Sequence, residues 1–177
     1  AAYSFGLKRI VIADAFAVAS GFVIRVLVGA AAVQVEASHW LLLCTLFLAL
    51  FLSFAKRHSE LRLLGQDSVN HRLVLASYSP ALIGQLNVIL CAVTVVSYAL
   101  YTVAPETITK FGTDRLVYTV PFVLYGLFRY LYLVEIKGDG GNPSTLALRD
   151  RGLVICIVLW LLACLVIIYS SALGESR

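Results

Sequence analysis

The sequence predicts an all-α protein, a polytopic transmembrane helix bundle with about five spans. Hydrophobic residues make up 60% of the chain and charged residues only 14%, whereas soluble domains carry about 25% charged residues. The hydrophobic residues gather in five runs, and a helix that crosses a bilayer needs roughly 20 of them. None of these runs alternates strictly as a membrane β-strand does, so helices satisfy the backbone polar groups in lipid.

The five expected spans are separated by connections of different character. The connection 34–39 is short, so the first two helices form an antiparallel hairpin, whereas 56–79 is long, polar and basic. Pro105 and Gly112 mark the next connection, and a Gly- and Pro-containing run at 138–143 marks the last as a turn. The spans run over residues 10–33, 40–55, 80–103, 116–136 and 153–173.

We expect residues 1–177 to form a single transmembrane domain. The chain starts without Met, lacks a signal-peptide pattern, and its first residues read as the end of a helix. These features suggest the C-terminal part of a longer chain. No Cys or His spacing predicts a metal site, and we expect the lipid bilayer, not a nucleic acid, as the partner of the apolar surface.

Basic residues are unequally shared between the two sides of the predicted bundle. Alternating spans place nine of them on one side and three, Lys110, Arg115 and Arg177, on the other. The positive-inside rule makes the first side cytoplasmic, which predicts a multi-pass protein of the cell membrane with a cytoplasmic active face. The nine are Lys8, Arg9, Lys56, Arg57, Arg62, Arg72, Lys137, Arg149 and Arg151.

Ionisable residues inside the spans are candidates for function, because they are costly in lipid. Asp14 and Arg25 are 11 residues apart in the first span, so they share one helix face. They either line an internal cavity or serve structurally, as an ion pair with other helices or a snorkelling Arg. Arg129 in the fourth span is expected to face the interior, toward Asp14, a ligand phosphate or a structural partner.

Basic residues of separate spans converge at the cytoplasmic side. The first hairpin brings six charged residues to one end of two adjacent helices: Lys8, Arg9, Asp14, Lys56, Arg57 and Glu60. Such a cluster suits phosphate groups, and it also suits a solvated cluster that fixes topology or attracts anionic lipid.

A similar group opens the fifth span. Asp150 is favourable in a first helical turn, which explains it structurally. Arg149 and Arg151 beside it either bind phosphate or follow the positive-inside rule.

Residues 54–61 read Phe-Ala-Lys-Arg-His-Ser-Glu-Leu, at the end of the second predicted span. In this run, which is the most specific match, the chain resembles the UbiA-type family of intramembrane prenyl-group transferases, in its decaprenyl-phosphate phosphoribosyltransferase branch. Aromatic-acceptor prenyltransferases usually have an aspartate-rich motif there, which this chain lacks. The other matches keep their order along the chain and lie at residues 3–9, 24–30, 127–130 and 147–151.

The resemblance implies a nine-helix fold and transfer of 5-phosphoribose from phosphoribosyl pyrophosphate to a polyprenyl phosphate, for cell-envelope glycan precursors. The family's Mg²⁺-binding motif, Asn-Asp-x-x-Asp, is absent from this sequence. We therefore expect the magnesium ligands upstream of Ala1 and no activity from this segment alone.

The resemblance also implies roles for individual residues. Five cations would face the substrate phosphates: Lys8, Lys56, Arg57, Arg149 and Arg151. Glu60 would orient one of them, and Asp14 and Arg25 would line the cavity. The alternatives are a UbiA-type prenyltransferase with another acceptor and a non-enzymatic transporter or scaffold segment, for which broken helices near the midplane would be diagnostic.

Overall fold

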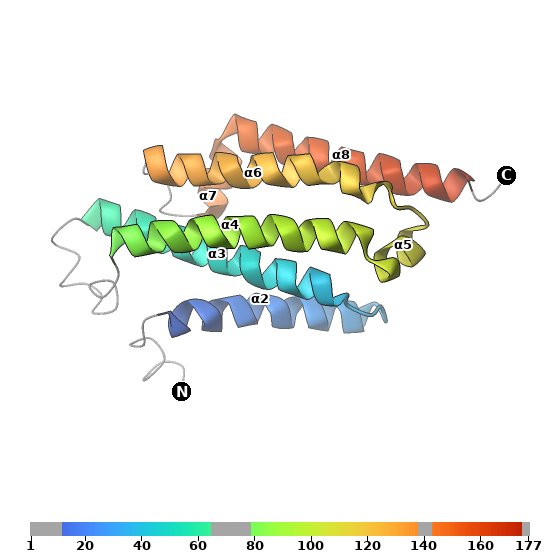
Figure 1. Cartoon of the computed structure of the whole chain (residues 1–177), viewed down its shortest axis with the longest axis horizontal. Coiled ribbons are helices and arrows are strands. Elements are labelled where there is room, and N and C mark those ends of the chain that lie inside the picture. The colour runs from blue at the N-terminus through green and yellow to red at the C-terminus, as the bar shows by residue number, and fades with distance from the viewer. Residues whose placement is uncertain (1–11, 65–78, 138–142, 175–177) are drawn as a thin grey trace.

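The protein is an all-helical bundle of antiparallel helices in a computed structural model, which describes residues 12–64, 79–137 and 143–174. No strand occurs in these ranges. Five helices are long and apolar enough to cross a membrane, which confirms the predicted fold class. They lie side by side, with α3 between α2 and α4 and with α6 between α4 and α8 (Figure 1).

The first three long helices follow the predicted spans closely at most of their ends. They are α2 (Ala13–Ala32), α3 (His39–Leu64) and α4 (Pro80–Val103). The start of α4 is set by Ser79, whose Oγ accepts a hydrogen bond of 3.0 Å from the Leu82 amide, and by Pro80 in its first turn.

The end of the second span was predicted wrongly. We expected a helix ending at residue 55 and a loop from residue 56, but α3 continues to Leu64. Charged residues end a lipid-buried segment without ending a helix, because Lys, Arg and Glu are good helix formers. The buried face of α3 also continues past residue 55, through His58 and Ser59.

The second half of the chain contains two short helices inside connections that we expected to be irregular. These are α5 (Pro105–Phe111), which ends at Gly112 with φ 65°, and α7 (Pro143–Arg149). The fourth span is composite: a 3-10 turn η4 (Arg115–Thr119), α6 (Val120–Tyr132) and a π-helical turn η5 (Leu133–Lys137). The last helix, α8, runs over Arg151–Gly174.

The packed interior lies where α3, α4 and α6 meet. Phe51 and Phe54 of α3 pack there with Ile83 of α4 and with Leu133 and Val134 of η5, all of them buried. The outer helices α2 and α8 instead expose large apolar side chains over much of their length. In a membrane such surfaces face lipid or other apolar helices, since lipid tails compete equally well for them.

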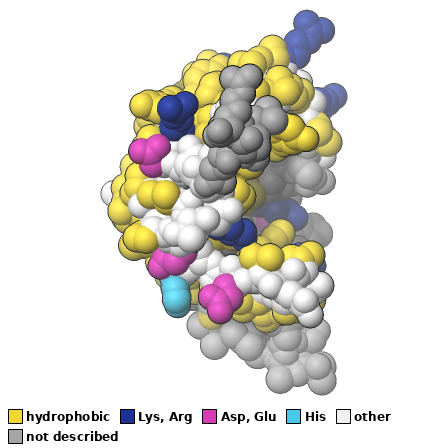
Figure 2. Space-filling view, turned by 90° about the vertical axis from the view of Figure 1, so that its right-hand side faces the viewer, with side chains coloured by type: hydrophobic (Ala, Val, Ile, Leu, Met, Phe, Trp, Pro, Cys, Tyr) yellow, Lys and Arg dark blue, Asp and Glu magenta, His cyan; other side chains and the backbone are white. Residues whose placement is uncertain are grey.

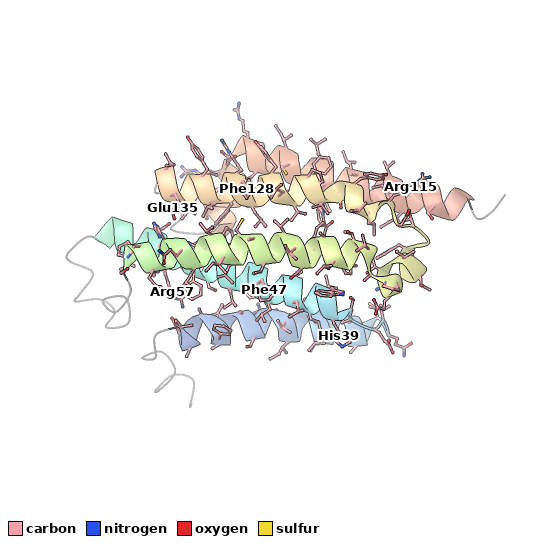
Figure 3. All side chains as sticks on the ribbon, viewed as in Figure 1. His39, Phe47, Arg57, Arg115, Phe128 and Glu135 are labelled. Atoms are coloured by element: carbon pink, nitrogen blue, oxygen red, sulfur yellow. The ribbon has the colours of Figure 1, made fainter. Side chains whose placement is uncertain are left out.

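The antiparallel order gives the bundle two ends of different chemistry. The first, called the polar end below, joins the start of α2, the end of α3, the start of α4, η5, α7 and the start of α8 (Figure 1). Arg57 and Glu135 lie at this end, opposite His39 and Arg115 (Figure 3).

The far end is closed by α5, η4 and the end of α8, where Ser171 Oγ donates to the Gly112 carbonyl at 2.6 Å. Figure 2 views the far end and shows charged side chains dispersed among hydrophobic ones.

Candidate functional site

The polar end begins with an ion pair between α2 and α3. A guanidinium nitrogen of Arg57 contacts a carboxylate oxygen of Asp14, and both side chains are mostly buried. Arg57 also donates to the Ser53 carbonyl at 2.8 Å, and its guanidinium carbon lies 5.8 Å from the centre of the Phe54 ring. Arg57 is therefore held on several sides by its own chain, which limits its freedom to reach a substrate.

Lys56 lies next to Arg57 but is held much more loosely. Its ammonium is 4.0 Å from Glu60 Oε1 one turn further along α3, and its side chain is 49% exposed. Exposed pairs of this kind contribute little to stability, about 0.3–0.5 kcal/mol. Lys56 is thus available to an anion, and the orienting role of Glu60 stays a prediction.

A second contact, between the titratable side chains of His58 and Glu135, was missed by sequence reasoning. His58 is 3% exposed, and its Nε2 lies 3.4 Å from Oε2 of Glu135 on η5. Gly84 of α4 flanks the pair: a β-carbon there would lie 3.7 Å from Glu135 Oε1 and 3.9 Å from His58 Cε1. The available signal was spacing, because His58 stands four residues after the apolar Phe54 on the same helix face.

A third contact joins α6 to the start of α8. Arg129 donates from Nε to Asp150 Oδ1 at 3.1 Å and from Nη2 to Oδ2 at 2.9 Å. Of the alternatives stated for Arg129, contact with Asp14 is excluded because Asp14 is taken by Arg57. The structure shows instead a structural partner, Asp150. Two antiparallel neighbours, α6 and α8, bring these residues together although 21 positions separate them.

Arg149 and Arg151 stand on either side of Asp150, and both are exposed. No carboxylate pairs with either in the part of the chain that the structure describes. Asp150 accepts a hydrogen bond of 2.9 Å from the Leu153 amide. The expected place of Asp150 in the first turn of the last span was wrong by one position, because α8 begins at Arg151 and Asp150 precedes it as the capping residue. Residues 149–151 therefore form a hydrogen-bonded turn with two exposed arginine side chains.

Arg25 does not join this group. It lies three helical turns from Asp14, is exposed, and its guanidinium carbon sits 5.2 Å from the centre of the Phe22 ring. The shared helix face of Asp14 and Arg25 therefore does not bring their charges together. Lys8 lies outside the described residues, and the cavity-lining roles of Asp14 and Arg25 remain predictions.

Similarity to known proteins extends over most of this chain. No family model matches the chain. Curated relatives do: one from Mycolicibacterium smegmatis is 32% identical over 165 residues, covering 90% of this chain. Another, from Corynebacterium glutamicum, is 32% identical over 94% of this chain, and one from Mycobacterium tuberculosis is 30% identical over 90%. Each is named a decaprenyl-phosphate phosphoribosyltransferase.

This chain is a homologue of the decaprenyl-phosphate phosphoribosyltransferases. The relationship confirms the resemblance to that branch. The chain spans about half the length of the curated relatives it matches, 50–52%. Nothing in the comparisons favours an aromatic-acceptor prenyltransferase or a transporter.

The described residues that we predicted to bind phosphate fall into two groups, which differ in exposure and in whether a carboxylate already pairs with them. Lys56, Arg149 and Arg151 are exposed and loosely held, whereas Arg57 is bound by Asp14. Anion recognition is best served by the first group, because a cation that is already neutralised gains less from a phosphate.

The described residues do not fit a magnesium site of their own. No three of their His, Cys, Asp and Glu side chains are grouped closely enough to hold a metal ion. The carboxylates of Asp14 and Asp150, at the polar end, are both engaged by arginine. Magnesium therefore remains an expectation drawn from the resemblance, with ligands outside these residues.

Proposed function

We propose that the native protein transfers 5-phosphoribose from phosphoribosyl pyrophosphate to a polyprenyl phosphate, decaprenyl phosphate by analogy with the relatives. The observation that carries the proposal is the exposed cations at one end of a membrane-embedded bundle, in a homologue of enzymes with that name. The product is suited to serve as a lipid-linked precursor of cell-envelope glycans.

In this reaction an oxygen of the lipid phosphate attacks the anomeric carbon of the donor. The bond from that carbon to the pyrophosphate oxygen breaks, and its electron pair leaves with pyrophosphate. Negative charge grows on the leaving group, so fixed cations that meet it there lower the barrier. Arg149 and Arg151 supply planar guanidinium groups for such oxygens, and Lys56 supplies a point charge.

The same architecture suits the lipid substrate. Its chain needs apolar surroundings and its phosphate needs cations, and the bundle offers both at the polar end. The excess of basic residues on that side favours a cytoplasmic orientation in the cell membrane. A water-soluble phosphorylated donor would then reach the site from the cytoplasm.

The test is a transfer assay with membranes that contain the native protein, expressed from its own gene. Labelled phosphoribosyl pyrophosphate and decaprenyl phosphate are supplied, and lipid-linked phosphoribose is measured. We expect Lys56→Ala, and the double variant Arg149→Gln with Arg151→Gln, to lower transfer at least tenfold while inserting normally. Arg115→Gln at the far end is the matched control. Failure of the unsubstituted protein to make the product would refute the proposed function.

A further inference from the structure

We infer that Arg129 is a positioning residue, which acts through Asp150 to hold the turn that presents Arg149 and Arg151 to phosphate. This inference rests on the proposed function for its substrate. The sequence left Arg129 with a cavity-lining or orienting role, and the inference gives it one partner and one task. It also adds Gly152 as a residue on which the site depends.

The contact between Arg129 and Asp150 has the geometry of a strong pair. Two separate nitrogens of the guanidinium donate to the two carboxylate oxygens, at 3.1 Å and 2.9 Å. A paired fork of this kind fixes orientation as well as distance. The guanidinium carbon also lies 5.5 Å from the centre of the Tyr132 ring. The Arg129 side chain is therefore held by Asp150 and an aromatic ring, although 31% of it is exposed, so the experiment below separates positioning from direct contact with phosphate.

Asp150 in turn organises the backbone on both of its sides. Its amide donates to the Leu146 carbonyl at 3.2 Å, which closes α7, and its carbonyl accepts from the Val154 amide at 3.0 Å, which opens α8. Its Oδ1 accepts from the Leu153 amide at 2.9 Å and caps α8. One residue thus ends one helix, starts the next and is anchored to α6 by Arg129.

Gly152 makes room for this arrangement. A β-carbon at that position would lie 3.0 Å from Asp150 Oδ1, 3.4 Å from Arg129 Nε and 3.5 Å from the Tyr125 hydroxyl. These contacts are close enough to push the carboxylate or the guanidinium away. A methyl group at 152 therefore perturbs the pair without removing any charge from the site.

Arg149 and Arg151 are the immediate chain neighbours of Asp150, so the backbone that Arg129 holds also sets their positions. Both are exposed, whereas the Asp150 side chain between them is mostly buried. If Arg129 acts only through this turn, its substitution weakens phosphate binding only in a protein that keeps the charges of Arg149 and Arg151. If Arg129 binds phosphate itself, the effects of the substitutions add.

The experiment measures binding of inorganic pyrophosphate to the purified native protein in detergent by titration calorimetry. The proteins are the unsubstituted form, Arg129→Gln, Gly152→Ala, the double variant Arg149→Gln with Arg151→Gln, and the double variant combined with Arg129→Gln. We expect Arg129→Gln to weaken binding about tenfold in the native background and less than twofold in the double-variant background, because residues that act as a unit are not additive. Arg115→Gln is the control and should bind normally.

Gly152→Ala keeps every charge of the site. It therefore tests the Arg129–Asp150 pair even if Arg129→Gln fails to fold. It should weaken pyrophosphate binding severalfold, with the melting temperature followed in parallel. Three results would each overturn the inference. The first is an effect of Arg129→Gln that adds to that of the double variant, and the second is normal pyrophosphate binding by both Arg129→Gln and Gly152→Ala. The third is the lack of pyrophosphate binding by the unsubstituted protein. Coupled binding without phosphoribose transfer would refute the proposed function alone, and transfer with additive effects would refute the positioning role alone.

Discussion

His58 on α3 and Glu135 on η5 face each other across the α3–α6 interface, with Nε2 and Oε2 3.4 Å apart. Most of His58 is removed from solvent, while Glu135 is 31% exposed. The pair ties the helix that carries Lys56 and Arg57 to the helix that carries Arg129. The charged contacts of the polar end therefore run from α2 through α3 and α6 to α8.

The His58–Glu135 contact should contribute to stability. We expect His58→Gln, Glu135→Gln and their combination to show a coupling free energy of about 0.5–2 kcal/mol, because residues in direct contact are not independent. Thermal unfolding of the purified protein in detergent measures it. Strict additivity of the two single substitutions would show that the contact contributes nothing.

Gly84 limits the size of the residue that can face this pair. Because its β-carbon position lies 3.7–3.9 Å from Glu135 and His58, which is ordinary contact, Gly84→Ala should be tolerated. Gly84→Leu should destabilise the protein by about 1–3 kcal/mol through overpacking. Melting temperatures compare the two variants, and equal effects of Ala and Leu would contradict the packing geometry.

Asp14 and Arg57 form a mostly buried pair between α2 and α3. Removing one partner leaves the other charge unpaired, so Asp14→Ala and Arg57→Ala should each cost about 3 kcal/mol of stability. Their combination should cost less than the sum. Denaturation in a series of detergent mixtures measures the stability of each variant. A double variant whose loss of stability equals the sum of the two single losses would mean that the pair is not formed.

Asn87 lies on the buried face of α4, with no exposed surface and no hydrogen-bond partner for either side-chain atom among the described residues. A buried amide without a partner costs about 1–3 kcal/mol. We therefore expect Asn87→Leu to raise the melting temperature in detergent. A lower melting temperature would indicate that Asn87 makes hydrogen bonds in the native protein, for example with water.

Much of the fold could be read from the sequence, and particular residues show where that reading stopped. Pro80 and Val103 were predicted as the limits of a span, and they are the limits of α4. The end of α3 was missed because polarity was taken as the end of the helix, although hydropathy reports only the lipid boundary. At the candidate site, Asp150 was predicted in the first turn of the last span, whereas it stands just before α8 as the capping residue, and its partner Arg129 was not found.

The sequence by itself determined that this protein is a membrane helix bundle and which end of it is polar, because hydropathy and charge are properties of each segment taken alone. Only the tertiary structure decided which charges meet. Arg57 pairs with Asp14, His58 with Glu135, and Arg129 with Asp150. Such pairings depend on how each helix is rotated and on which helix packs beside it, and spacing along one helix does not carry that information.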